Sequence, residues 1–129
     1  MSLIKPHGSD ELNPLFVYDT AKNEALQKEA EGLASIVVSS ATAANAVMLG
    51  GGYFNPLTGY MNKADALSVA NNMKTTSGLF WPTPVLNLVK NAGSIKACDR
   101  IALKDPNVEG NPVLAVMDVK AVEEFSDAD

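Results

Sequence analysis

The residues that first suggest chemistry are three consecutive glycines, Gly50 to Gly52, and a fourth at Gly59. A glycine-rich loop that cradles phosphate has the motif GxxxxGK(S/T), whose lysine and hydroxyl reach the phosphate and Mg²⁺. Here Tyr60, not lysine, follows Gly59. A dinucleotide-binding GxGxxG leaves a strand and opens a helix, whereas this stretch follows a segment predicted to be helical. Both patterns therefore argue against a nucleotide-binding loop.

The sequence has one histidine, His7, and one cysteine, Cys98. Catalytic and metal-binding histidines act with partners, and no cysteine, histidine or carboxylate cluster surrounds His7 in the sequence. We expect a structural role for it in the turn Pro6-His7-Gly8. Cys98 would need a nearby base to act as a nucleophile, so we expect a buried structural thiol. A small enzyme built on either residue is the least favoured alternative.

Charged and aromatic residues give no clearer site. We expect the acidic tail to be a solvated face, because its spacing matches no calcium-binding loop. Four scattered basic residues would bind an anion only if folding brought them together, and Phe80 and Trp81 fit a core or an interface better than a base-stacking platform. The acidic residues are Asp118, Glu123, Glu124, Asp127 and Asp129, and the basic ones Lys5, Lys96, Arg100 and Lys104. We predict no catalytic, cofactor-binding or metal-binding residue.

Length and composition restrict the class of protein. The chain has 129 residues, 47% of them hydrophobic, which suits one domain with a sizeable core. Its net charge of −5 argues against binding to nucleic acid. The N-terminus turns polar after four residues, unlike a signal peptide, and no apolar stretch approaches the length of a membrane span. A single cysteine excludes an internal disulfide and fits the cytoplasm.

Helices are predicted in the first half of the chain. Residues 1–16 should form an extended arm anchored by Ile4, Leu12, Leu15 and Phe16. Asp19 or Thr20 caps a helix that ends at Glu31 before Gly32, and a buried strand follows at 35–39. Further helices are expected at 41–49, capped by Ser39, Ser40 or Thr42, and from Asn62 to about Lys74. Between them, 50–61 should be a connector with Tyr53, Phe54 and Leu57 packed inward.

Strands are predicted in the second half. Residues 85–89 should form one strand, and 100–104 and 113–119 a hairpin with a long polar loop. The second hairpin strand is apolar at successive positions, so both of its faces should be covered. Residues 121–129 should begin a short helix. Helices first and strands later indicate an α+β domain.

Four stretches resemble the N-terminal domain of ATP sulfurylases (sulfate adenylyltransferases). They are IKPHGSDEL at 4–12, GGYFNPLTGYMNKAD at 51–65, FWPTPVLNLV at 80–89 and RIALKDPNVEGNPVLAVMDV at 100–119. The resemblance implies that 1–129 is one PUA-like domain, a mixed β pseudo-barrel with flanking helices. It also implies that the barrel is incomplete at its C-terminal end and packs on a catalytic domain absent from this chain.

The family converts ATP and sulfate to adenosine 5′-phosphosulfate and pyrophosphate, with MgATP as the nucleotide. Its catalytic motifs, Gln-x-Arg-Asn-Pro-x-His-x-x-His and a Gly-Arg-Asp loop, are missing: the only arginine, Arg100, follows Asp99. We therefore expect an inactive N-terminal domain of a cytoplasmic, homo-oligomeric enzyme of sulfur metabolism, with no cofactor of its own. A free-standing PUA-like interaction module is the alternative. An open sheet edge would lead the isolated chain to associate edge to edge or by domain swapping.

Overall fold

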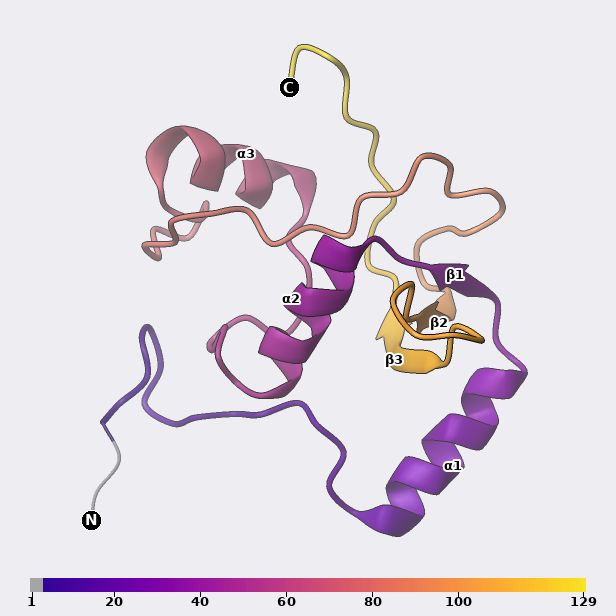
Figure 1. The fold of residues 1–129 in the computed structure, drawn as a ribbon. Coiled ribbons are helices and arrows are strands. Elements are labelled where there is room, and N and C mark those ends of the chain that lie inside the picture. Colours follow the sequence, from indigo (N-terminus) through magenta and orange to yellow (C-terminus); the bar gives the residue numbers. More distant parts are fainter. Residues whose placement is uncertain (1–3) are drawn as a thin grey trace.

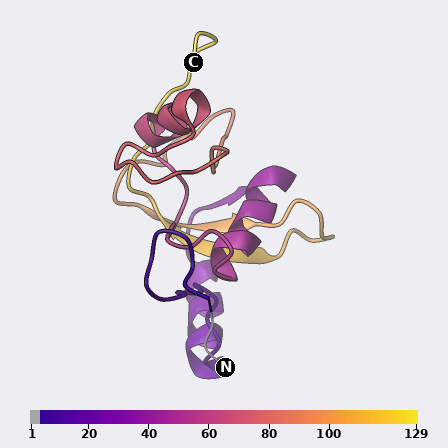
Figure 2. The same cartoon turned by 90° about the vertical axis from the view of Figure 1, so that its left-hand side faces the viewer.

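The computed structural model describes residues 4–129, which have a mixed α+β architecture. The helices are α1 (Thr20–Glu31), α2 (Ser40–Gly50) and α3 (Lys63–Asn72), and the strands are β1 (Ser35–Val37), β2 (Arg100–Lys104) and β3 (Val113–Asp118). The sheet lies in the middle of the molecule, with α1 at one end and α3 and the C-terminus at the other (Figure 1 and Figure 2). Long irregular segments connect these elements.

All three helices begin at residues that the sequence predicts as caps. The side chains of Asp19, Ser39 and Asn62 each accept a hydrogen bond from the backbone N–H three residues later. Each of these bonds satisfies a donor that has no partner within its helix. Gly32 ends α1 as predicted, and α3 ends at Asn72, two residues before the predicted end, followed by Met73 in the left-handed region (φ 54°).

The sheet has the order β1-β2-β3, with β1 parallel to β2 and β2 antiparallel to β3. The predicted hairpin is therefore confirmed, and the four central residues of β3 are partly buried. The prediction that β1 is buried is wrong. Ser35 and Val37 are exposed, Val37 at 54%, while Ile36 is only partly buried against the core. Val38, beyond the strand, is buried. The expected edge-to-edge association or domain swapping of the isolated chain stays a prediction.

Two hydrophobic clusters form the core. One covers the sheet and contains Val38, Ala43, Ile101, Leu103 and Val119. The other lies between α2 and α3 and contains Leu49, Val69, Trp81 and Val85. Trp81 is thus a core residue, packed edge to face against Phe54 at 5.7 Å between ring centroids. Phe80 is mostly exposed.

Two predicted elements do not form. Residues 85–89 are extended but belong to no sheet, and a cleft of about 540 Å³ lies between residues 88–91 and the edge of β1. The predicted helix at 121–129 is an irregular segment instead. A helix this short is marginal by itself, and the acidic side chains of the tail bind Lys63 at the start of α3.

The N-terminal arm, residues 4–16, lies across the three glycines at the end of α2. The backbone N–H groups of Leu15 and Phe16 both donate to Gly50 O, at 2.8 and 3.0 Å. A side chain at Gly50 would overlap the Phe16 ring, and a Cβ at Gly52 would lie 3.1 Å from Leu12. Leu12, Leu15 and Phe16 are therefore anchors, as predicted, although each keeps one side in solvent. Ile4 is 96% exposed and is not an anchor.

We predict that Gly50→Ala lowers the free energy of unfolding by about 1 to 3 kcal/mol, because the added methyl group displaces Phe16. Gly59→Ala is the matched control: a Cβ at Gly59 would meet no atom within 4 Å. Urea denaturation followed by Trp81 fluorescence measures both. Ala is the better helix former, so an equally stable or more stable Gly50→Ala variant would mean that the arm does not need this close approach.

Candidate functional site

His7 lies in the turn that the sequence predicts, and its side chain makes contacts with a distant segment that the sequence does not indicate. Its Nε2 lies 2.7 Å from the carbonyl oxygen of Phe80, so Nε2–H donates. The imidazole also packs against the rings of Phe80 and Trp81, at 6.2 and 6.1 Å between centroids. The histidine therefore ties the N-terminal arm to the segment that carries the core tryptophan.

Cys98 is exposed, so the prediction of a buried thiol is wrong. It occupies a turn with φ 73°, and its N–H donates to Val119 O at 2.8 Å. The turn places the backbone in register with the end of β3 and leaves the side chain in solvent. The residue type alone does not predict this exposure of the thiol.

The basic residues do not converge on an anion site. Arg100 binds Glu29 of α1 at 2.6 Å and Asp118 of β3 at 2.8 Å, and these hydrogen bonds raise the pKa of Arg100. Lys5 pairs with Asp10 at 2.8 Å, within the N-terminal arm. Within residues 4–129 no group of three or more His, Cys, Asp or Glu side chains is placed to hold a metal ion. None of the helices described is both long and apolar enough to cross a bilayer.

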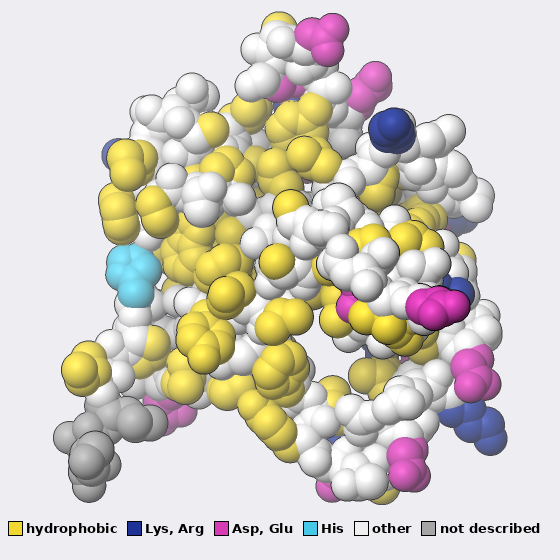
Figure 3. Space-filling model, viewed as in Figure 1, with side chains coloured by type: hydrophobic (Ala, Val, Ile, Leu, Met, Phe, Trp, Pro, Cys, Tyr) yellow, Lys and Arg dark blue, Asp and Glu magenta, His cyan; other side chains and the backbone are white. Residues whose placement is uncertain are grey.

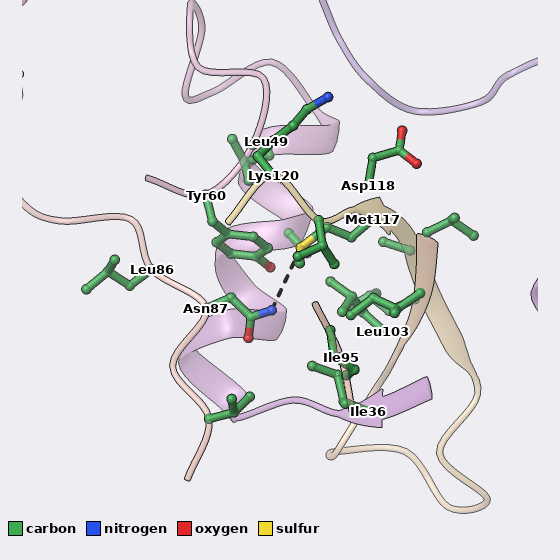
Figure 4. A pocket seen from close by; sticks show the side chains of 18 of the residues that line it. Ile36, Leu49, Tyr60, Leu86, Asn87, Ile95, Leu103, Met117, Asp118 and Lys120 are labelled. Carbon is green, nitrogen blue, oxygen red and sulfur yellow. Dashed lines mark hydrogen bonds between the residues drawn. The ribbon is translucent and has the colours of Figure 1, made fainter. Parts of the chain in front are cut away.

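A hollow with a volume of about 1680 Å³ lies beside the sheet. Apolar side chains form much of its wall, including those of Ile36, Ile95, Leu103 and Met117 (Figure 4). We call it the sheet hollow. It exceeds the roughly 300 to 1000 Å³ of typical small-molecule pockets, so its size suits a polypeptide segment better than a single small ligand.

Polar and charged side chains share the wall of the sheet hollow with the apolar ones. Tyr60 OH donates to Thr42 O at 2.7 Å, and burial raises the pKa of Tyr60 to about 12, so the phenol stays neutral. The Asn87 amide points toward Met117, with Nδ2 3.8 Å from Sδ (Figure 4). Its Oδ1 is buried and accepts no hydrogen bond from the residues described. Asn87 Oδ1 is thus a buried acceptor in the hollow that is free to bind a donor group.

The acidic tail is held by Lys63, a contact that the sequence did not indicate. Lys63 N donates to Glu123 Oε2 at 2.8 Å, and its Nζ reaches Glu124 O at 2.8 Å and Asp129 at 2.9 Å. The Nζ also lies 5.4 Å from the centre of the Phe125 ring. Hydrogen bonds from the Ser126 backbone and from Lys63 lower the pKa of Asp129 to about 2. We call these contacts the tail clamp; Glu123 and Asp129 are therefore paired, although they remain exposed.

The glycine-rich connector differs from its prediction at one residue. Tyr53 is 78% exposed, with its ring beside Gly51, where a Cβ would lie 2.9 Å from the ring atoms. Phe54 and Leu57 pack against the second core cluster, as predicted. Only glycine at position 51 leaves room for the Tyr53 ring, which consequently folds back over the end of α2 with its other face outward.

Comparison with known proteins gives a consistent picture. A family model described as "PUA-like domain" matches residues 4–129. Sulfate adenylyltransferases of Alcanivorax borkumensis and Allochromatium vinosum are each 62% identical to this chain, over 129 and 126 residues, which is 100% and 98% of it. The chain spans only 32% of the length of either relative and matches their N-terminal region. It is also similar to a solved structure described as "Hexameric APS kinase from Thiobacillus denitrificans", with a TM-score of 0.78 and 29% identity, over 97% of this chain and 24% of that one.

We predict that Asn87→Leu raises the free energy of unfolding by about 1 kcal/mol, because it removes a buried acceptor that has no donor. Thr42→Val is the comparison. The Thr42 hydroxyl donates to Leu86 O and accepts from Ser39 Oγ, so its loss should cost about 1 to 2 kcal/mol. Urea denaturation measures the free energy of unfolding of both variants. Equal destabilisation by both would mean that Oδ1 is hydrogen-bonded in solution.

The tail clamp should open in acid. The pKa of Asp129 in the folded chain, about 2, lies below its ordinary value of 3.8. The carboxylate's contribution is therefore present above pH 3.8 and is lost as the pH falls through 2. Carboxyl-carbon NMR shifts measure the titration directly. Lys63→Met should move the midpoint part of the way toward 3.8 and Lys22→Met should not, whereas an unmoved midpoint in both would show that Lys63 does not hold the tail.

Proposed function

Because this chain belongs to the PUA-like domain family, we propose that residues 1–129 are the N-terminal domain of a sulfate adenylyltransferase. The observation that carries the proposal is identity of 62% along the whole chain to two proteins of that name, confined to about a third of their length. The parent enzyme would convert MgATP and sulfate to adenosine 5′-phosphosulfate and pyrophosphate, in the cytoplasm and in sulfur metabolism.

In this proposal the domain performs no chemistry by itself. Attack of sulfate on the α-phosphorus of ATP requires groups that neutralise phosphate oxygens in one place, together with Mg²⁺. Arg100 pairs with Glu29 and Asp118, and Lys5 pairs with Asp10, which supports the view that these two cations serve the fold of the domain. The catalytic residues would lie in the two thirds of the parent outside the match.

The domain would be a PUA-like pseudo-barrel whose sheet is completed by later residues of the parent. Three strands with an adjoining hollow of about 1680 Å³ support this view, because a small open sheet buries little by itself. The parent would also be a homo-oligomer, a proposal that the similarity to a hexameric protein supports.

A free-standing interaction module is the second candidate. The sheet hollow, with its unpaired Asn87 acceptor, is the observation that favours it. The net charge of −5 makes nucleic acid an unfavourable partner for such a module.

A chimera tests the main proposal. This chain would replace the matching 129 residues of the Alcanivorax borkumensis relative, and pyrophosphate release from MgATP and sulfate would be measured. We expect activity within about tenfold of the natural relative, equal to about 1.4 kcal/mol in transition-state stabilisation. The 129-residue chain alone should release no pyrophosphate above the blank.

Two outcomes would contradict the proposal. Pyrophosphate release by the chain alone would show that it contains catalytic groups. A folded chimera without activity, beside an active natural relative, would show that this chain cannot serve as the N-terminal domain and would favour the interaction module.

A further inference from the structure

The sequence has no charged residue between Glu31 and Lys63, a stretch that includes all of α2. A surface helix normally places charged or polar side chains on its solvent face, as α1 does with Lys22, Glu24 and Lys28. By contrast, α2 exposes apolar residues at helical spacing. They are Ala41, Ala44, Val47 and Met48. This solvent face of α2 has the character of an interface.

The N-terminal arm extends this apolar face. Phe16 lies against Gly50 and Leu12 against Gly52, while the Tyr53 ring covers Gly51. Together with two residues of α2 these side chains form what we call the arm patch. It consists of Leu12, Phe16, Val47, Met48 and Tyr53, each between 40% and 78% exposed. Figure 3 shows hydrophobic side chains gathered over α2 and the arm on the face turned toward the viewer.

The backbone beneath the arm patch is fixed by hydrogen bonds. Gly50 O accepts from Leu15 and Phe16, Met48 O accepts from Tyr53 N at 3.0 Å, and Val47 O accepts from Gly51 N at 2.9 Å. Aromatic side chains on a fixed backbone lose little conformational freedom when a partner covers them, and such residues dominate the energetics of interfaces. The arm patch is therefore built before any partner arrives.

We propose that the arm patch docks on the catalytic region of the same polypeptide. The inference rests on the proposed function, under which about two thirds of the parent lies outside this chain. The larger apolar patches on a protein surface often mark interaction sites, and interfaces between domains of one chain are of moderate size. A second copy is a poorer occupant. Each copy carries a charge of −5, and a patch without charges has nothing to offset the repulsion.

Footprinting tests the docking. Hydroxyl radicals would be applied to the chimera described above and to the 129-residue chain alone, and oxidation of Met48 and Tyr53 would be read by mass spectrometry. We expect several-fold slower oxidation of both residues in the chimera. Val108, in the loop between β2 and β3 and also exposed, serves as the reference that should not change.

Substitutions provide the second measurement. Tyr53→Lys should leave the stability of the isolated chain nearly unchanged, because the side chain is exposed, but should speed proteolytic cleavage between the two regions of the chimera. Val108→Lys is the matched control and should not speed this cleavage. Cleavage that is equally fast in the two variants would overturn the docking.

The footprint is informative whether or not the chimera is active. Slower oxidation of Met48 and Tyr53 in an inactive chimera would support the docking and contradict the enzymatic assignment. An active chimera with Met48 and Tyr53 as reactive as in the isolated chain would overturn the docking and keep the assignment. Protection already present in the isolated chain, with a dimer in light scattering, would assign the arm patch to a second copy instead.

Discussion

The fold depends on the close approach of the N-terminal arm to three glycines without side chains. Gly50 O is one of the carbonyl groups that an α-helix leaves without a partner at its C-terminal end, and the N–H groups of Leu15 and Phe16 supply that partner. An arm with no secondary structure thereby becomes part of the domain. With the arm in place, His7 reaches Phe80 O, and the amide of Asn55 bonds to Asn13 and Glu11.

The arm and Tyr60 compensate for a sheet that is too small to organise the whole chain. The three strands bury one cluster, and residues of α2, α3 and the segment 81–85 form the other. Tyr60 packs against both clusters, and its hydroxyl bonds to Thr42 O in α2. The polar link holds α2 to the connector at the point where the two clusters meet. Beside the sheet, however, the interior stays open, since no element among residues 4–129 fills the sheet hollow.

The features that could be predicted are those that neighbouring residues determine. Asp19, Ser39 and Asn62 cap their helices because a short oxygen-bearing side chain there satisfies a nearby N–H whatever the tertiary structure. The hairpin of β2 and β3 follows in the same way from two apolar runs and a polar loop. The resemblance to sulfate adenylyltransferases likewise followed from motifs within short stretches.

Features that depend on distant segments could not be predicted. Residues 85–89 have a strand-like composition, but a strand needs a partner, and β1 lies across a cleft from them. The acidic tail has a helix-like composition, but Lys63 draws it into the tail clamp. Tyr53 looks like a core residue, but its ring lies over Gly51 at the end of α2 and is 78% exposed. The buried Asn87 is a further example, because the lack of a hydrogen-bond donor for its Oδ1 depends on the shape of the whole hollow.

The glycine-rich stretch illustrates why a motif can be specific and still carry no chemistry. Gly50 and Gly52 let the arm approach, and Gly51 lets Tyr53 turn its ring outward, so the same three residues position the anchors of the fold and the arm patch. The fold and the proposed docking surface therefore depend on the same requirement, which is that positions 50 to 52 carry no side chain. A domain that buried this surface in its own core could not present it to a partner, and a domain without the arm would lack two of the five residues of the arm patch. The absence of charge from Gly32 to Asn62 is consistent with a surface that becomes interior when a partner covers it.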